Sequence, residues 1–168
     1  MLALVLLRLI AFSACLFTGA GKTTLLDILA GRKNSGSLNG AIFVNGSPVD
    51  AATFNRSVAY CEQNDMHMPL ATVREAFDDA ALLRLESGVT AAVRYAFVEN
   101  LLDLLELKHL AHRKVGDVGS DTGLSPGERK RLTIGVELCA NTPILFLDEP
   151  TVSYCVSMQS NQMFALSF

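Results

Sequence analysis

The sequence predicts an α/β fold in which a phosphate-binding loop and a later apolar strand flank an inserted block of helices. Three observations support this fold. A glycine-rich loop at 18–24 ends in Gly-Lys-Thr-Thr, an apolar run at 144–147 ends in two adjacent carboxylates, and the pattern between 72 and 107 is helical. Strands and a phosphate loop on either side of helices are typical of an α/β core with a helical subdomain.

The first half of the chain carries the signals of one helix and two strand regions. A helix is expected over 22–30, with Gly31 as its C-terminal stop. A short strand over 41–44 precedes Asn45-Gly46, the strongest hairpin signal in the sequence, and a further strand is expected over 57–61. Helix and strand thus alternate behind the loop, as in an α/β core.

The second half is helical until the last strand. Two capping boxes mark helix starts, Thr72-x-x-Glu75 and Ser125-x-x-Glu128, the latter with proline at the first helical position. Residues 116–124 are rich in glycine and aspartate and predict a loop. Apolar residues at helical spacing form two successive faces, Val73, Phe77 and Ala80 and then Val93, Phe97, Leu101 and Leu104.

Length and charge restrict the function classes. With 168 residues the chain has the length of one domain, and its net charge of −3 indicates no basic surface for nucleic acid. A phosphate group must then be bound by a local site. The four cysteines are scattered without metal-ligand spacing, which favours a reducing, cytosolic setting.

The segment 1–17 is apolar apart from Arg8 and allows three interpretations. A membrane-spanning helix needs about 20 such residues, and a central arginine opposes insertion. A signal peptide with a cleavage region around 11–15 would lose the strand that must precede the phosphate loop. We therefore expect residues 11–17 to form that buried strand.

The loop at 18–24 has the residue types that bind nucleotide phosphates. Glycine lets backbone N–H groups approach the β- and γ-phosphates, Lys22 adds a positive charge to the same oxygens, and the Thr23 hydroxyl is suited to Mg²⁺. Leu16 replaces the first glycine of the usual G-x-x-x-x-G-K-T pattern, which predicts strain or displacement in the first turn of the loop.

Two further groups complete the predicted chemistry. Asp148 is expected to hold Mg²⁺ through water and Glu149 to polarise the attacking water, because both follow an apolar strand in a chain with a phosphate loop. The Ser125 hydroxyl, the Gly127 N–H and a helix N-terminus have the composition of an anion site. Taken alone, helix capping is the simpler explanation of these residues.

Taken together, these motifs resemble the nucleotide-binding domain of an ABC transporter, most closely the G subfamily of pleiotropic-drug-resistance type, over 18–151. The matches are Walker A at 19–33, the Q-loop at 60–65, the signature motif in its subfamily form at 124–138, and Walker B at 144–150. The resemblance implies a P-loop NTPase core with a RecA-like sheet, incomplete at both ends. Its expected divisions are an apolar segment at 1–17, a partial nucleotide-binding domain with a helical subdomain at about 72–138, and a divergent tail at 152–168.

The resemblance also implies an activity and partners. The cassette would bind ATP and Mg²⁺ and hydrolyse ATP to power membrane export of hydrophobic compounds or lipids. It would pair with a second nucleotide-binding domain and with a transmembrane domain at the cytosolic face of a membrane, whereas the fragment alone would be cytoplasmic and poorly active.

The site residues that the resemblance implies fall into three sets. Catalysis would use Glu149 and Gln63, and the metal would be held by Thr23, Gln63 and Asp148. The nucleotide would be bound by Thr18, Gly19, Ala20, Gly21, Lys22, Thr23, Thr24 and Gln63. Ser125 and Gly127 would contact the ATP of a partner cassette.

Departures from the family pattern leave an alternative open. Where the family continues with Ser-Gly-Leu-Asp after Thr151, this chain has Val152-Ser153-Tyr154-Cys155, and no histidine follows His112. A non-hydrolysing ATP-binding remnant, or a dominant-negative partner of full-length cassettes, is therefore the second hypothesis. A soluble ABC ATPase of DNA repair or translation fits the subfamily form of the signature less well, and a phosphate-loop kinase leaves it unexplained.

Overall fold

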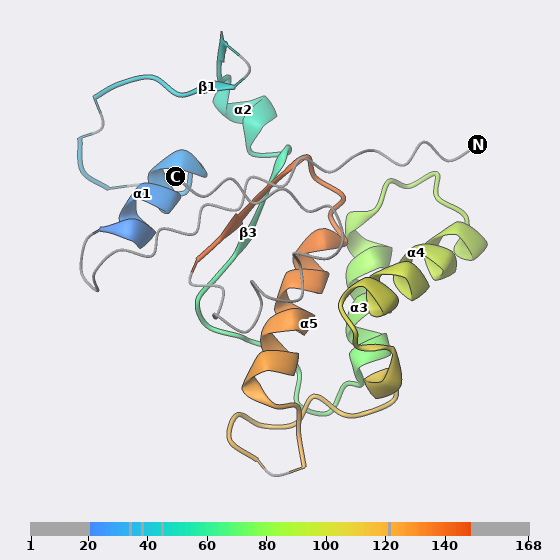
Figure 1. Ribbon diagram of the computed structural model, residues 1–168. Helices are drawn as coiled ribbons and strands as arrows, with labels where there is room; N and C mark the ends of the chain where they lie inside the picture. Colours follow the sequence, from blue (N-terminus) through green and yellow to red (C-terminus); the bar gives the residue numbers. More distant parts are fainter. Residues whose placement is uncertain (1–20, 34, 38, 45, 121, 149–168) are drawn as a thin grey trace.

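The computed structural model describes residues 21–33, 35–37, 39–44, 46–120 and 122–148. A parallel pair of strands, β3 (Val58–Cys61) and β4 (Ile144–Leu147), lies at its centre. Helix α1 (Lys22–Leu29) covers one face of this pair, and the helical block that connects β3 to β4 covers the other (Figure 1). The predictions for 1–20 and 149–168 lie outside the described residues.

The two central strands bury side chains on both faces. Val58 pairs with Ile144 and Cys61 with Leu147, so the strands run in register along their whole length. Because side chains alternate along a strand, one set packs against α1 and the other against the helical block. The first set is Val58, Tyr60, Ile144 and Phe146, and the second is Ala59, Cys61, Leu145 and Leu147. Strands buried on both faces explain the continuous apolar run at 144–147.

The segment between α1 and β3 follows the prediction closely. Helix α1 ends at Leu29, and Gly31 adopts a positive φ of 70° just beyond it, as a helix stop requires. Strands β1 (Phe43–Val44) and β2 (Ser47–Pro48) form the expected antiparallel hairpin. The short helix α2 (Ala51–Phe54) was not predicted, although the Asp50 carboxylate that accepts the Thr53 N–H at 3.1 Å is a recognisable cap.

The helical block contains α3 (Val73–Arg84), α4 (Ala91–Leu104) and the 3₁₀ turn η1 (Lys108–Leu110). The Thr72 capping box is present, and Val73, Phe77 and Ala80 are buried as predicted. The face predicted for α4 is partly wrong, because Leu104 is 47% exposed. The buried positions are Val98, Leu101, Leu102 and Leu105, whose spacing places the apolar face one residue further along the helix.

Helix α5 (Pro126–Leu138) returns the chain from the loop at 116–124 to β4. Its capping box and first-position proline are as predicted. The helix packs closely against α3 at Gly135, where an added Cβ would lie 2.2 Å from Phe77 Cε1 and 2.5 Å from Leu105 Cδ1. The absence of a side chain at Gly135 therefore allows α5 to pack this closely against α3.

Cys61 and Cys139, the two cysteines within the described residues, are buried free thiols, and burial raises the pKa of each to about 12. Such thiols are chemically inert near neutral pH.

Among the described residues, no helix is long and apolar enough to cross a membrane.

Candidate functional site

The carboxyl ends of β3 and β4 bring two predicted site residues to one edge of the sheet. The Asp148 N–H donates to the Cys61 carbonyl at 3.1 Å, which extends the strand pairing past Leu147. Gln63 therefore leaves the sheet beside Asp148. Asp148 is only 3% exposed. A buried carboxylate is costly unless it is paired or coordinates a metal, which fits the predicted role in binding Mg²⁺.

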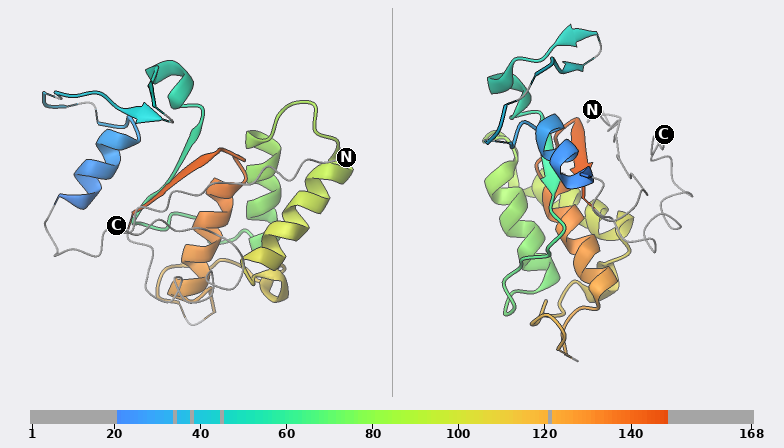
Figure 2. Two further views of the ribbon diagram at one scale, coloured as in Figure 1. Left: turned by 45° about the horizontal axis from the view of Figure 1, so that its top comes forward. Right: turned by 90° about the vertical axis from the view of Figure 1, so that its left-hand side faces the viewer.

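Helix α1 begins at this same end of the sheet (Figure 1 and Figure 2). Gly21 precedes it in the left-handed conformation, with φ 80° and ψ 18°, and its carbonyl accepts the Leu25 N–H at 2.9 Å. Among the described residues no side chain caps this helix, and the N–H groups of a first turn have no partner within a helix. These donors and the positive end of the helix dipole can receive a phosphate.

The described part of the phosphate loop is limited to its last residues. Thr23 and Thr24 are exposed at the start of α1, where the Thr23 hydroxyl is available to a metal. Thr18, Gly19 and Ala20 lie outside the described residues, as do the Lys22 side chain and Glu149.

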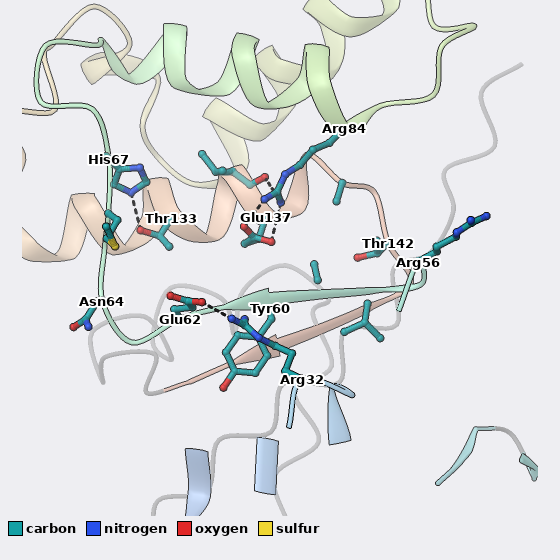
Figure 3. A pocket seen from close by; sticks show the side chains of 15 residues that line it. Arg32, Arg56, Tyr60, Glu62, Asn64, His67, Arg84, Thr133, Glu137 and Thr142 are labelled. Carbon is teal, nitrogen blue, oxygen red and sulfur yellow. Dashed lines mark hydrogen bonds and ion pairs between the residues drawn. The ribbon is translucent and has the colours of Figure 1, made fainter. Parts of the chain in front are cut away.

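Arg32 connects the end of α1 to the segment that carries Gln63. Its guanidinium carbon lies 4.3 Å from the centre of the Tyr60 ring, and Nη2 donates to the carboxylate of Glu62 (Figure 3). Burial raises the pKa of the Tyr60 phenol, and the negative charge of Asp148 raises it further. Tyr60 therefore remains neutral and adds no charge beside Asp148.

Lys130 holds the same segment from the helical side. It is 3% exposed on α5, and its ammonium donates to the Glu62 carbonyl at 2.6 Å and to the Gln63 carbonyl at 3.1 Å. Its Nζ also lies 3.5 Å from Asp65 Oδ1. The peptide that carries Gln63 is thus fixed to the signature helix by a buried cation.

Thr133, three residues further along α5, makes a second connection to this segment. Its hydroxyl lies 2.7 Å from Asp65 Oδ1. The same hydroxyl lies 2.8 Å from His67 Nε2 (Figure 3). When the single hydroxyl proton goes to Asp65, Nε2 must donate to the Thr133 oxygen. Burial lowers the pKa of His67, and the nearby charge of Arg129 lowers it further while Asp65 opposes the shift.

The start of α5 is closed by its own side chains. Ser125 Oγ accepts the Glu128 N–H at 3.4 Å, and Glu128 Oε2 accepts the Ser125 N–H at 2.7 Å. Although burial raises the pKa of Glu128, hydrogen bonds from the Ser125 backbone and from its hydroxyl lower it below its usual range, so the hydroxyl proton is already shared with the Glu128 carboxylate. At Gly127 an added Cβ would meet nothing within 4 Å among the described residues, so this backbone can be approached from outside.

Arg129 fixes the loop that leads into α5. It is 5% exposed, and its Nη2 donates to the Val115 and Gly116 carbonyls at 3.0 and 2.9 Å. The Leu124 N–H also donates to the Val115 carbonyl, at 2.9 Å. The residues before Ser125 are therefore held in place independently of a ligand.

A groove of about 670 Å³ lies beside β3 and α5 (Figure 3). Across it, Arg84 at the end of α3 pairs with Glu137 of α5 at 2.8 Å. The exposed side chain of Met66 borders the groove, and Met68 and Leu70 follow it in the chain at 77% and 80% exposure. Other residues that line it include Arg32, Tyr60, Asn64 and His67.

The predicted site residues fall into two groups in space. Gln63, Asp148 and the start of α1 with Gly21, Thr23 and Thr24 lie at one end of the sheet. Helix α5, in contrast, begins at the bottom of Figure 1, apart from the start of α1. Ser125 and Gly127 are therefore not part of the first group.

Comparison with known proteins gives the family. Residues 17–152 match the ABC transporter family. The chain belongs to the ABC transporter family. Over 134 residues it is 52% identical to ABC transporter G family member 34 of Arabidopsis thaliana and to pleiotropic drug resistance protein 2 of Nicotiana plumbaginifolia. Over 144 residues it is 49% identical to ABC multidrug transporter G of Aspergillus fumigatus.

The chain spans only a small part of the length of these relatives, and its fold is shared with a solved structure. It covers 9% of the length of the two plant proteins and 10% of the fungal one, and the alignments include 80% and 86% of this chain. A solved structure of cbiO1 from Clostridium perfringens, part of the ABC transporter complex cbiONQ, superposes with a TM-score of 0.64. That match covers 86% of this chain and 55% of the other at 22% identity. The P-loop NTPase fold is thereby confirmed.

Family membership bears on the cofactors. Cassettes of this family bind nucleotide, typically with Mg²⁺. Within the described residues no group of three or more His, Cys, Asp or Glu side chains could hold a metal. Mg²⁺ is usually bound by one or two carboxylates together with water and substrate phosphates. Among the described residues, Asp148 at the end of β4 and the Thr23 hydroxyl in the first turn of α1 are oxygen donors of the kinds that Mg²⁺ accepts.

The sequence analysis assigned no role to Lys130, Thr133 or Arg32. A signal for Lys130 was present, because it lies four and eight residues before Ile134 and Leu138 on the buried face of α5. A lysine on the apolar face of a helix predicts a buried partner. Its partners, two backbone carbonyls far away in the sequence, leave no such signal.

Proposed function

We propose that this chain is an ATP-binding cassette that binds Mg-ATP at the start of α1 and hydrolyses it to power membrane export, as one of two cassettes in a transporter. The observation that carries the proposal is the burial of Asp148 at the carboxyl end of β4, next to the end of β3 and at the end of the sheet where α1 begins without a side-chain cap among the described residues. A phosphate group and a divalent cation find complementary partners at such an edge.

Each residue that the motifs assign to this site has a distinct proposed role. The loop residues Thr18 to Thr24 bind the phosphates through backbone N–H groups, and Lys22 adds positive charge. The Thr23 hydroxyl and Asp148 hold Mg²⁺, with Gln63 as a further ligand that responds to the metal. Glu149 polarises the attacking water, a contribution of about 10²–10⁴-fold in rate for a positioned general base.

Ser125 and Gly127 are proposed to bind the γ-phosphate of ATP held by a second cassette. Two observations support this assignment. The Gly127 backbone is open, and the start of α5 lies apart from the start of α1. ATP would then lie between two cassettes, with each supplying one of the two sites, and its hydrolysis would release them.

The proposed partner on the membrane side is a transmembrane domain. The groove beside β3 and the exposed Met66, Met68 and Leu70 support this proposal, because both adjoin the segment that carries Gln63. A contact there would connect membrane helices to the metal site at the cytosolic face. We propose export of hydrophobic compounds or lipids because the relatives include a pleiotropic drug resistance protein and a multidrug transporter.

A non-hydrolysing ATP-binding cassette, which would act as a dominant-negative partner or as a remnant, is the second candidate. The residues Val152-Ser153-Tyr154-Cys155 after Thr151 favour this second candidate, because the family pattern has Ser-Gly-Leu-Asp there.

We further propose that the chain divides into an apolar segment at 1–17, a cassette at 18–151 with a helical subdomain at about 72–138, and a tail at 152–168.

Binding and turnover of Mg-ATP by the purified chain test these proposals. Binding by calorimetry should be measurable but weak and should be lost in Lys22→Ala, whereas Lys33→Ala should retain it. Turnover by the isolated chain should be slow, and any turnover should disappear in Glu149→Gln. Binding that Lys22→Ala leaves unchanged would contradict the assignment of the phosphate loop, and turnover that survives Glu149→Gln would contradict the role of Glu149.

A further inference from the structure

Lys130 is a buried cation whose hydrogen bonds all go to the segment that leaves β3. Its ammonium donates to the carbonyls of Glu62 and Gln63 and lies 3.5 Å from the Asp65 carboxylate. Two of the three donors of the ammonium bond to these carbonyls, and the Asp65 carboxylate balances its charge. Because α5 carries the signature motif, Lys130 physically connects that motif to the Gln63 peptide.

The burial of Lys130 indicates that its charge has a specific use. Removing an ammonium group from water is costly unless it is paired and hydrogen-bonded, and an apolar residue of similar volume often packs at lower cost. At 3% exposure this side chain carries that cost. In return, the charge fixes the position of two peptide carbonyls that lie beyond the end of β3.

Two further contacts restrain the same short segment. On the α5 side the Thr133 hydroxyl lies 2.7 Å from Asp65 Oδ1. On the α1 side Arg32 pairs with the Glu62 side chain (Figure 3). Glu62 is thus restrained through its side chain from α1 and through its carbonyl from α5. Lys130 is the one described residue that donates to the carbonyl of Gln63 itself.

We propose that Lys130 is a positioning residue that fixes the Gln63 peptide, so that the Gln63 side chain meets a metal ion held at Asp148. This inference rests on the proposed function, since it concerns the same metal. Residues that hold a metal ligand in place contribute to metal affinity without touching the metal. Lys130 also makes the position of Gln63 depend on α5, whose first turn carries Ser125 and Gly127.

The test uses the full 168-residue chain and a slowly hydrolysed fluorescent ATP analogue titrated at increasing Mg²⁺. Lys130→Met removes the ammonium and keeps the length of the side chain. We expect the Mg²⁺ concentration for half-maximal binding to rise by about tenfold, with binding of the metal-free analogue little changed. Lys130→Arg, which keeps the charge, should recover part of the loss. Lys108→Met, at an exposed lysine paired only with carboxylates, is the control.

A second readout is independent of nucleotide. Hydrogen exchange of a peptide covering 62–65 should be faster in Lys130→Met than in the wild type, while a peptide covering α4 should be unchanged. If Lys130→Met does not fold, Thr133→Val provides the second variant, because it loosens the same segment through Asp65 without removing a buried charge. It should raise the Mg²⁺ requirement and the exchange rate in the same direction.

Three outcomes separate the inference from the proposed function. Wild-type chain that binds the analogue without any effect of Mg²⁺ overturns the proposed function and this inference with it. A Mg²⁺ requirement that Gln63→Ala raises but Lys130→Met and Thr133→Val leave unchanged overturns the inference alone. Shifts that are fully additive in Gln63→Ala/Lys130→Met also overturn it, because a positioning residue has no effect once the side chain it positions is gone.

Discussion

Helices α1 and α5 both begin at predicted phosphate sites, but their first turns are built differently. The first turn of α1 follows a left-handed glycine, and no described side chain caps it. The first turn of α5 is closed by a reciprocal capping box between Ser125 and Glu128, with Pro126 at the first position. Among the described residues, the N–H groups in the first turn of α1 have no side-chain cap and can receive a ligand, whereas the capping box of α5 satisfies the N–H groups of Ser125 and Glu128 and leaves the Gly127 peptide open.

This difference has consequences for stability. An uncapped helix start is less stable until an anion completes it, so the order of α1 should depend on nucleotide. The start of α5 is held by its cap and by the buried Arg129, which donates to two carbonyls of the preceding loop. We therefore expect the start of α5 to be ordered without a ligand and the start of α1 to become more ordered when nucleotide binds.

The largest expected effect is on the ligand-dependent side. Lys22→Ala should weaken binding of Mg-ATP by about 2–3 kcal/mol, or roughly 30–150-fold, because a hydrogen bond to a charged partner is lost. The free energy of unfolding without nucleotide should change little. Calorimetric titration and denaturant unfolding measure the two quantities, with Lys33→Ala as the control. If Lys22→Ala reduced the free energy of unfolding as much as the free energy of binding, the start of α1 would not differ from the capped start of α5 in depending on a ligand.

The next effect concerns the rigidity of α5. Gly135→Ala should reduce the free energy of unfolding by about 1–3 kcal/mol, because the new methyl group would overlap Phe77 and Leu105. Gly127→Ala in the first turn of the same helix should leave stability unchanged, since its Cβ would meet nothing within 4 Å among the described residues. Denaturant unfolding of this matched pair provides the measurement. A similar loss in both variants would show that the start of α5 is not open.

A smaller effect isolates the cap of α5. Ser125→Ala should cost about 1 kcal/mol of stability, because the acceptor for the Glu128 N–H is lost. Ser125→Asp should retain the cap and the stability. It should nevertheless oppose ATP-dependent pairing of two cassettes, since its charge would face a phosphate. Unfolding and light scattering with ATP measure the two properties, and unimpaired pairing of Ser125→Asp would contradict the proposed role in trans.

The smallest effect is a pH dependence on the α5 side. Burial lowers the pKa of His67 below 6.5, so the unfolded chain takes up the proton first as the pH falls. The stability contributed by neutral His67 is therefore present above about pH 6.5 and is lost as the pH falls through the lower folded pKa. His67→Gln should flatten this part of the stability curve. If the pH dependence of the free energy of unfolding were unchanged in that variant, groups other than His67 would cause it.

The sequence predicted the elements that depend on local signals. The strands at β3 and β4, the hairpin, both capping boxes and the stop at Gly31 follow from spacing and residue type, and each is present. The face of α4 was misjudged because apolar residues surround this helix, so that Leu104 could not be distinguished from Leu105 by hydrophobicity alone. Only packing against α3 decides which of them is buried.

The candidate site was predictable as motifs but not as an arrangement. Spacing identified Gln63, Asp148 and Ser125 as members of family patterns. The contacts that hold Gln63 in place come from Lys130 and Arg32, which lie 67 and 30 residues from their partners in the sequence. Their acceptors are a backbone carbonyl and a strand-end carboxylate, and neither carries a pattern that single-sequence reasoning can detect.

Hydrogen exchange with and without Mg-ATP tests the contrast between the two helix starts most directly. In the monomeric chain, we predict that Mg-ATP slows exchange of the amides in the first turn of α1 and leaves those in the first turn of α5 unchanged. Slower exchange at the start of α5 in the monomer, or none at the start of α1, would contradict the account.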